Sequence, residues 1–191
     1  MRELVFLLEE PSARAMLENV LPRMLPDDIA FRYIVFEGKQ DLMNQMARRI
    51  RGYLNPDARF VVLRDQDSAP DCRIVKDDLL RLVHNSGKAE KTVVRIACRE
   101  LEAFYLADLA AVGLAFGLPK LAREQNRQKF RAPDYLGSPS RELHLLTKGR
   151  YQKVGGSREI AAHLALDNER SESFKHLISA IRRLGGELQA G

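Results

Sequence analysis

The sequence Arg59-Phe60-Val61-Val62-Leu63-Arg64-Asp65-Gln66-Asp67-Ser68 holds the pattern around which the rest of the chain is organised. Residues 60–63 form a short apolar, β-branched run, which is typical of a strand buried in a parallel sheet. Extended backbone sends alternate side chains to the same side, so Asp65 and Asp67 are expected to leave the strand end together. Two such carboxylates repel each other unless a cation lies between them. A turn in which one aspartate caps the next helix is the alternative interpretation.

Similar apolar runs occur elsewhere and alternate with helical patterns. Strands are predicted over residues 3–8, 29–36, 60–63 and 91–97, and helices over 12–25, 41–53, about 69–85 and 100–116. Strands that alternate with helices imply right-handed βαβ units. The sequence therefore predicts an α/β fold with an open, mostly parallel four-stranded sheet flanked by helices.

Apolar spacing and capping residues give finer predictions for the helices. Ser12 is a possible N-cap of the first helix, and Ser171 and Ser173 of the last. Spacings of three and four residues predict the buried sides of two further helices. These are Leu42, Met46, Ile50 and Leu54 in one helix, and Ile74, Leu79, Leu82 and Val83 in the other.

Beyond residue 116 the pattern loosens, and Pro and Gly interrupt any long element. We divide the chain into an α/β core, residues 1–116, and a basic, loop-rich helical extension, residues 117–191, packed on that core. Helices are expected at about 119–130, 140–148, 157–166 and 171–184. Residues 117–158 hold ten Lys or Arg against three acidic residues, a net charge of +7. Basic residues interleaved with Phe130, Tyr135 and Tyr151 suit a nucleic-acid track, whereas the alternative is a solvated surface with the aromatic rings in the core.

Composition excludes several classes of protein. No apolar run among the 191 residues approaches the roughly 20 needed to span a membrane, and the N-terminal segment lacks the features of a signal peptide, so a cytoplasmic location is expected. Cys72 and Cys98 have no neighbouring Cys or His at zinc-ligand spacing, and two cysteines make no disulfide framework. Both are interpreted as small buried residues, and the four histidines as structural.

Acidic residues follow three of the four predicted strands. Glu9 and Glu10 follow the first strand, Asp65 and Asp67 the third, and Glu100 and Glu102 the fourth. Ligands of open parallel sheets bind outside the carboxyl ends of the strands, where these acids gather. Two or three carboxylates suffice for a hard cation such as Mg²⁺ or Mn²⁺, which can assist phosphodiester chemistry.

The roles of the flanking residues stay open at this stage. Glu100 and Glu102 share a face if the segment is extended, but their side chains lie about 200° apart in a helix. A helix is expected to begin near Arg99, so only one of the two, and either one, is the site acid. The other is expected to pair with Arg95, Arg99 or backbone amides. Lys39, after the second strand, either binds a phosphate or neutralises the acids. Arg64 is expected to form a salt bridge with the aspartates, and Glu10 to lie at the surface or behind the site.

The layout resembles the Toprim domain of topoisomerases, primases and the overcoming-lysogenisation-defect nucleases. That pattern places a glutamate after the first strand and Asp-x-Asp after the third, which are Glu9 and Asp65-Gln66-Asp67 in this sequence. The whole chain is similar to a bacterial family of small Toprim-like proteins associated with ATPase genes of defence-type loci. The matching segments are residues 8–12, 36–39, 65–67 with Cys72, 95–104, 151–153 and 171–174.

The resemblance implies a metal-dependent nuclease acting on DNA or RNA. It gives Glu9 a general acid/base or metal-binding role and makes Asp65 and Asp67 ligands of Mg²⁺ or Mn²⁺, with an ATPase as a possible protein partner. One departure is that Glu10 stands where Toprim domains usually have glycine. The alternatives are a non-catalytic Toprim-like module that docks on an ATPase or a nucleic acid, and a phosphatase or nucleotide hydrolase of a small substrate.

Overall fold

A four-stranded, all-parallel sheet lies at the centre of the computed structural model, which describes residues 1–190. The strand order is β2-β1-β3-β4, so β1 and β3 are central and β2 and β4 are edges. The strands are β1 (Glu3–Leu8), β2 (Ala30–Val35), β3 (Arg59–Asp65) and β4 (Thr92–Ala97). The α/β class and the parallel four-stranded sheet predicted from the sequence are confirmed.

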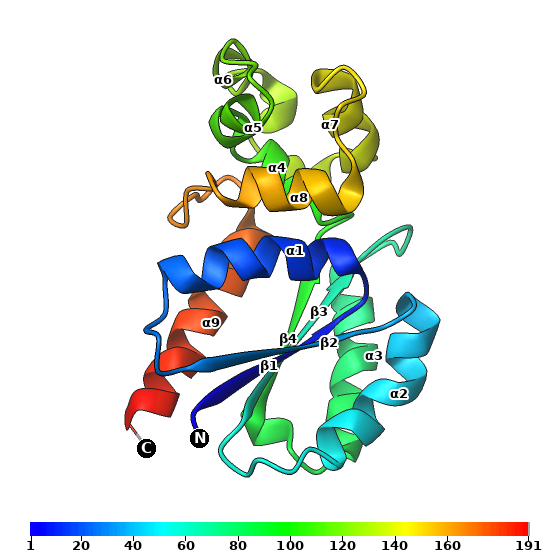
Figure 1. The fold of residues 1–191 in the computed structure, drawn as a ribbon. Helices are drawn as coiled ribbons and strands as arrows, with labels where there is room; N and C mark the ends of the chain where they lie inside the picture. The colour runs from blue at the N-terminus through cyan, green and yellow to red at the C-terminus, as the bar shows by residue number, and fades with distance from the viewer. Residues whose placement is uncertain (191) are drawn as a thin grey trace.

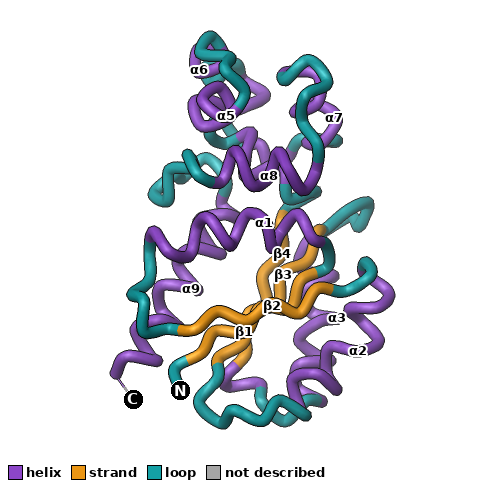
Figure 2. The backbone as a smooth tube through the Cα atoms, in the orientation of Figure 1, coloured by secondary structure: helices purple, strands orange, loops and turns teal. Residues whose placement is uncertain are grey.

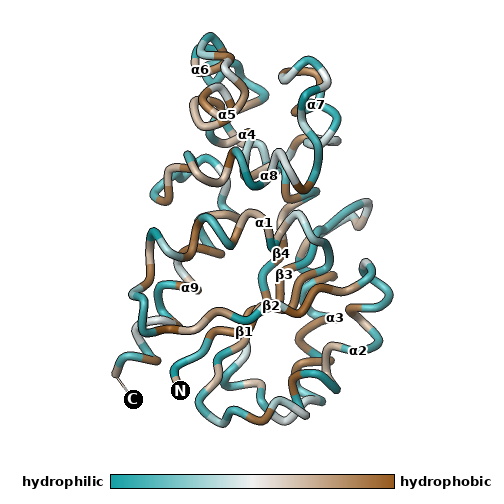
Figure 3. The backbone as a smooth tube through the Cα atoms, viewed as in Figure 1, coloured by the Kyte–Doolittle hydropathy of each residue, from teal (hydrophilic) through white to brown (hydrophobic). Residues whose placement is uncertain are grey.

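Helices cover both faces of this sheet (Figure 1). One face carries α2 (Lys39–Arg51) and α3 (Cys72–Asn85), and the other carries α1 (Pro11–Val20) and α9 (Glu172–Ala190). Alternate residues of β1 serve the two cores: Leu4 and Phe6 belong to the α1/α9 side, and Val5 and Leu7 to the α2/α3 side. Along α2 and α3 the hydropathy alternates, as expected for helices with one buried side (Figure 3).

A helical lobe stands over the carboxyl ends of the strands (Figure 1). It comprises α4 (Glu102–Leu106), α5 (Leu109–Ala115), α6 (Leu121–Glu124), α7 (Pro139–Leu146) and α8 (Lys153–Ala161), and loops make up much of the rest (Figure 2). Short 3₁₀ turns occur at Leu21–Arg23, Ala89–Lys91, Gln128–Phe130 and Pro133–Tyr135. The helix α8 lies against α1, so this lobe is joined to the α1/α9 side of the sheet.

Several predicted helix limits are wrong, and the polar contacts explain why. The single helix expected over residues 100–116 is two helices, because the Asp108 carboxylate accepts hydrogen bonds from the Ala111 N–H at 3.1 Å and the Ala165 N–H at 2.9 Å. The helix expected over 119–130 is reduced to the single turn of α6 and a 3₁₀ turn. The helix expected at 157–166 begins four residues earlier, at Lys153.

Other corrections concern which side chains are buried. Val75 lies in the core instead of Ile74, which is 53% exposed, and Leu82 is only partly buried. Leu54 is 96% exposed because α2 ends before it, at Gly52. Cys72 and Cys98 are half-buried.

The capping predictions have mixed outcomes. The N-cap position of α1 is Glu10, and the Ser12 hydroxyl donates to the Glu10 carboxylate at 3.3 Å, so Ser12 is not the cap. Ser171 does cap α9, since its oxygen accepts from the Phe174 N–H at 3.1 Å. No helix within residues 1–190 is long and apolar enough to cross a membrane.

Candidate functional site

The ends of β1 and β3 bring Glu9 and Asp65 together. These strands are paired in parallel with Leu8 opposite Leu63, so both chains leave the sheet at the same edge. The Glu9 carboxylate accepts a hydrogen bond from the Asp65 N–H at 3.3 Å, and the Glu9 side chain is almost fully buried. Two acids predicted from separate strands are therefore neighbours at the carboxyl ends of the two central strands.

The turn after β3 holds Asp67 in an unusual backbone conformation. Asp67 has φ +55°, and its N–H donates to the Arg99 carbonyl at 2.8 Å. Between the two aspartates, the buried Gln66 side chain donates to the Ala69 carbonyl at 2.7 Å and accepts from the Arg99 N–H at 3.2 Å. These bonds fix the loop, so the directions of the Asp65 and Asp67 side chains are set by the fold.

Two cations pair with these acids. The Lys39 ammonium lies 3.3 Å from an oxygen of Asp67, which places Lys39 at the strand edge where the sequence predicted it. Arg64 was expected to pair with the aspartates, but its Nε lies 3.6 Å from Glu9. The Arg64 side chain follows the alternation of β3 away from Asp65, so it reaches the β1 end instead.

The carboxyl group of Asp65 is crowded by other acids. Burial, and then the charges of Glu102 and Glu9, raise the pKa of Asp65 well above its usual value. Burial and the charge of Asp67 likewise raise the pKa of Glu9. The site thus holds more negative charge than its protein cations balance, and this excess favours either a proton or an external cation.

The structure separates the two glutamates that follow β4. The chain stays non-helical through Leu101, and α4 begins at Glu102. The Glu102 carboxyl is buried and contributes to the high pKa of Asp65, so Glu102 faces the site. Glu100 instead accepts a hydrogen bond from the Ser140 N–H at 2.6 Å, at the start of α7. The predicted helix start near Arg99 was three residues early.

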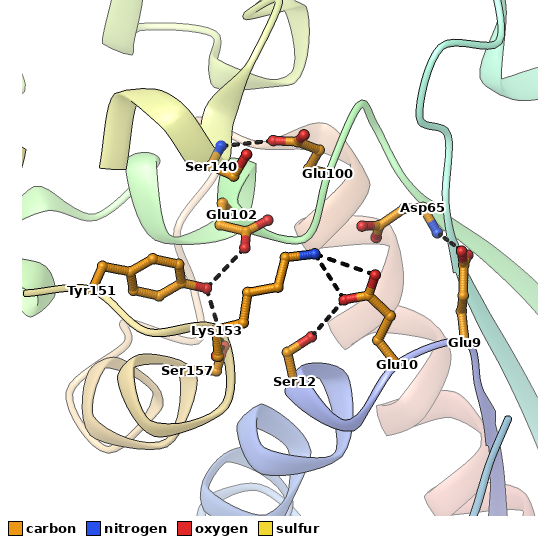
Figure 4. Close-up of polar contacts among 10 residues, drawn as sticks. All are labelled: Glu9, Glu10, Ser12, Asp65, Glu100, Glu102, Ser140, Tyr151, Lys153 and Ser157. Atoms are coloured by element: carbon orange, nitrogen blue, oxygen red, sulfur yellow. Dashed lines mark hydrogen bonds and ion pairs between the residues drawn. The ribbon is translucent and has the colours of Figure 1, made fainter. Parts of the chain in front are cut away.

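Sequence reasoning missed Lys153 as part of this site. Its ammonium bonds both oxygens of Glu10, at 3.0 and 3.2 Å, and reaches between Glu10 and Glu102 while the carboxyl of Asp65 points toward it (Figure 4). Partial burial disfavours the charged ammonium, but the bonds to Glu10 and the charges of Glu102 and Asp65 outweigh it and raise the pKa of Lys153. Residues 151–153 were the available signal, as a segment that resembles the Toprim-like family and as part of the basic section, but no site role was assigned to Lys153.

Tyr151 holds Glu102 in place. The Tyr151 hydroxyl donates to Glu102 at 2.9 Å and lies 3.3 Å from the Ser157 hydroxyl oxygen (Figure 4). Burial raises the pKa of this phenol, so it stays a hydrogen-bond donor. Tyr151 and Phe130 are buried, which agrees with the alternative that the aromatic rings of the basic section lie in the core, whereas Tyr135 is 85% exposed.

We refer to Glu9, Glu10, Asp65, Asp67 and Glu102 as the acidic rim. Its donors are all carboxylate oxygens, the ligand chemistry of Mg²⁺ and Mn²⁺. Within residues 1–190 no three His, Cys, Asp or Glu side chains form a ready-made metal-binding group. Magnesium commonly takes one or two protein carboxylates and keeps several waters, so the Glu9 and Asp65 pair with its uncompensated charge fits such an ion.

Comparisons with known proteins agree with this architecture. Residues 8–182 match the family described as "Domain of unknown function (DUF4276)". The chain belongs to this DUF4276 family. The matched range begins just before Glu9 and includes all the residues of the acidic rim as well as Lys39 and Lys153.

The DUF4276 chain also resembles a solved structure. The C-terminal region of the Burkholderia pseudomallei OLD protein is similar in fold, with a TM-score of 0.53 and 16% sequence identity, over 95% of this chain and 98% of that one. No curated protein matches the chain. The likeness extends over nearly the whole of both chains and is a similarity of fold.

Proposed function

We propose that this chain is a Toprim-like, metal-dependent phosphodiesterase that cuts DNA or RNA. The observation that carries the proposal is the concentration of partly uncompensated carboxylates at the ends of β1 and β3, with two lysines beside them. Its position matches the glutamate and Asp-x-Asp positions of the Toprim pattern. The fold-level likeness to the OLD protein region, one of the groups that the sequence resembles, is consistent with this proposal.

Each residue has a role in this proposal. Glu9, Asp65 and Asp67 would hold Mg²⁺ or Mn²⁺, which supplies a polarised water and charge stabilisation at a phosphoryl oxygen. Glu102, positioned by Tyr151, keeps the Asp65 carboxyl basic through its neighbouring charge. Lys39 and Lys153 present ammonium groups at the same rim, where they would contact phosphate oxygens. Glu100 is a catalytic candidate on sequence grounds, but its hydrogen bond to Ser140 gives it a structural role.

A non-catalytic docking module is the second candidate, and one observation favours it. Lys153 already supplies a positive charge among Glu10, Asp65 and Glu102, as a bound cation would. In that case the acidic rim is a structural salt-bridge network, and the protein acts by binding an ATPase partner or a nucleic acid. The two candidates differ in whether the purified protein binds a divalent ion.

Cleavage of labelled single-stranded DNA, duplex DNA and RNA in Mg²⁺ or Mn²⁺ tests the proposal. Asp65→Asn keeps the shape of the side chain and removes its charge, so it should lower the cleavage rate at least about hundredfold, since even residues behind metal ligands contribute about 10- to 100-fold. Asp77→Asn is the matched control, because Asp77 is an exposed aspartate on α3 outside the rim. Cleavage should be abolished by EDTA.

Metal binding gives a readout that is separate from cleavage. Mn²⁺ should raise the melting temperature of the wild type and of Asp77→Asn, but not that of Asp65→Asn, because only a folded site binds the ion. If Mn²⁺ raises none of these temperatures and no substrate is cut, even with an ATPase partner added, the phosphodiesterase proposal is wrong and the docking module stands.

A further inference from the structure

A large groove runs along the outer edge of β4. Its volume is about 990 Å³, at the upper end of the roughly 300 to 1,000 Å³ of ligand sites. Its walls come from the start of α3, from β4, from α9, and from two loops of the helical lobe near residues 131–135 and 169–170. We refer to it as the β4 groove. Separate parts of the chain build it, so no single sequence motif indicates it.

Three of the four acidic residues of the β4 groove are already paired. Asp71 lies 3.0 Å from Arg73, and Glu169 lies 3.1 Å from Lys175. The buried Asp134 carboxylate accepts from the Ser171 hydroxyl at 2.6 Å and from the Ser173 N–H at 2.8 Å; the remaining acid, Glu172, lies 4.0 Å from His176. The carboxylates of Asp71, Asp134 and Glu169 are therefore occupied within the protein, whereas Glu172 faces a histidine that is charged only when protonated.

Five cations in the same groove form no ion pair within residues 1–190, and they come from separate elements and loops. The guanidinium groups of Arg95 and Arg170 donate only to backbone carbonyls, with Arg95 bonding His176 at 3.0 Å. The groove therefore presents positive charge that the fold does not neutralise. The five are Lys76, Arg95, Arg99, Arg131 and Arg170.

An exposed aromatic ring adds a second recognition element. Tyr135 lines the β4 groove with 85% of its surface exposed, although Phe130 and Tyr151, the other two rings of the basic section, are buried. Exposed rings beside basic side chains stack on unpaired bases, and each such stack contributes to binding regardless of sequence. A duplex hides its bases from such a ring, so this arrangement favours a single strand.

The β4 groove adjoins the acidic rim. Gln66 and Arg99 line it, and Gln66 lies between Asp65 and Asp67 in the chain. The hydrogen bond from the Arg99 N–H to the Gln66 side chain joins the two loops at this junction. A strand lying in the groove would therefore lead toward the acids at the ends of β1 and β3.

We propose that the β4 groove binds a single strand of nucleic acid, with its phosphates on the unpaired cations and one base stacked on Tyr135. The choice of nucleic acid as partner rests on the proposed function. The test does not depend on cleavage, because binding is measured in EDTA, where no metal-dependent reaction occurs. If the protein binds the strand but never cuts it, the groove proposal is supported and the phosphodiesterase proposal is contradicted. If it cuts nucleic acid but the groove variants bind normally, the phosphodiesterase proposal is supported and the groove proposal is contradicted.

Fluorescence anisotropy with labelled oligo(dT) measures this binding. Arg131→Gln/Arg170→Gln removes two groove charges, and Lys120→Gln/Arg123→Gln removes two exposed charges on and beside α6, outside the groove. We expect the groove variant to bind about tenfold more weakly. Its log affinity should also depend less steeply on log salt, by about 0.7 for each phosphate that is no longer neutralised. The α6 variant should bind as the wild type does.

A second pair of variants tests the ring. Tyr135→Ser should weaken binding about tenfold, whereas Tyr135→Phe, which keeps the aromatic face, should not. The proposal is overturned if the groove and α6 variants weaken binding equally, or if the wild type does not bind oligo(dT). It is also overturned if a duplex binds as tightly as the single strand and Tyr135→Ser binds normally. Circular dichroism of each variant confirms that all are folded.

Discussion

The acidic rim and the β4 groove collect charge in opposite ways. At the rim, parallel strands end side by side, so carboxylates are forced together in a partly buried place and their pKa values rise. In the groove, cations from distant segments are spread over a large open space; Arg131 and Arg170 are exposed and the other three unpaired cations are partly buried. The buried carboxylates of Asp65 and Glu9 therefore cost folding free energy when they are ionised, whereas the exposed cations of the groove have little effect on folding. Mutations in the two regions should change stability very differently.

The largest stability effect is expected from Gly156→Ala, which disturbs the rim without changing any charge. A methyl group at this position would lie 2.4 Å from the Tyr151 ring and 3.4 Å from Phe116. We expect it to lower the free energy of unfolding by about 1 to 3 kcal/mol, as overpacked cores do, and to disturb the bond from Tyr151 to Glu102. Urea denaturation measures the change.

Gly155→Ala is the matched control for this prediction. It lies in the same helix, but nothing stands within 4 Å of the added methyl group. Alanine is a better helix former than glycine, so this variant should gain up to about 1 kcal/mol. If the two substitutions change the free energy of unfolding equally, the close packing of α8 against the Tyr151 ring does not contribute to stability.

The next effect is the pH-dependent gain in stability of Asp65→Asn. Because the pKa of Asp65 is raised in the folded protein, its protonated form is the stable one, and ionisation on raising the pH costs folding free energy. Each pKa unit corresponds to about 1.4 kcal/mol. The variant should therefore be more stable than the wild type at neutral pH, and this difference should disappear well below about pH 4, where Asp65 is protonated in both the folded and the unfolded state.

Melting curves from acid to neutral pH check this, with Asp77→Asn as the control that shows no such trend. A variant that is less stable than the wild type at neutral pH contradicts it, because the Asp65 charge would then be compensated. Loss of cleavage together with a gain in stability is the combination expected of a functional acid.

Lys153→Gln should change stability less and metal affinity more. The Lys153 side chain is 54% exposed and its ion pair with Glu10 is accessible to water, so stability should fall by less than about 1 kcal/mol. Removing a positive charge beside the acids should tighten Mn²⁺ binding, by roughly fivefold for a change of about 1 kcal/mol. Calorimetric titration measures this, and Lys120→Gln should leave the affinity unchanged. Weaker Mn²⁺ binding in Lys153→Gln would mean that the lysine positions the ligands.

The smallest effect is expected in the β4 groove. Arg131 and Arg170 are exposed and have no acidic partner within residues 1–190, so Arg131→Gln/Arg170→Gln should change the free energy of unfolding by no more than about 0.5 kcal/mol. The same denaturation experiment measures it. A large loss would show that these arginines hold the loops together, and the contrast between rim and groove would fail.

Local patterns in the sequence were enough to predict the sheet and its acidic edge. Short apolar runs ending in acids predicted β1 and β3, and parallel pairing then required Glu9 and Asp65 to meet. The chemical role of these residues stays a prediction. Helix limits failed where a distant partner decided them, as at Asp108, which also accepts a hydrogen bond from Ala165.

The other parts of the site depend on tertiary structure that no local pattern reveals. Lys153, at the start of α8, is 143 residues from its partner Glu10, at the start of α1, and the two meet because α8 lies against α1. Tyr151 is 49 residues from its partner Glu102. The basic section appeared continuous in sequence, but burial removed Tyr151 and Phe130 from its surface. Only Arg131 of the five unpaired groove cations belongs to that section, so charge density along the chain did not predict where positive charge gathers in space.

The position of α9 has a consequence for synthesis on the ribosome. This helix packs on β1, β3 and β4, and at Gly185 it approaches so closely that a methyl group would lie 2.5 Å from Leu25. Residues 11–20 cover part of this sheet face early in synthesis, but the part under α9 is covered only after residues 172–190 have emerged. Until then that part of the apolar face has no native cover, which makes the nascent chain a candidate for chaperone binding.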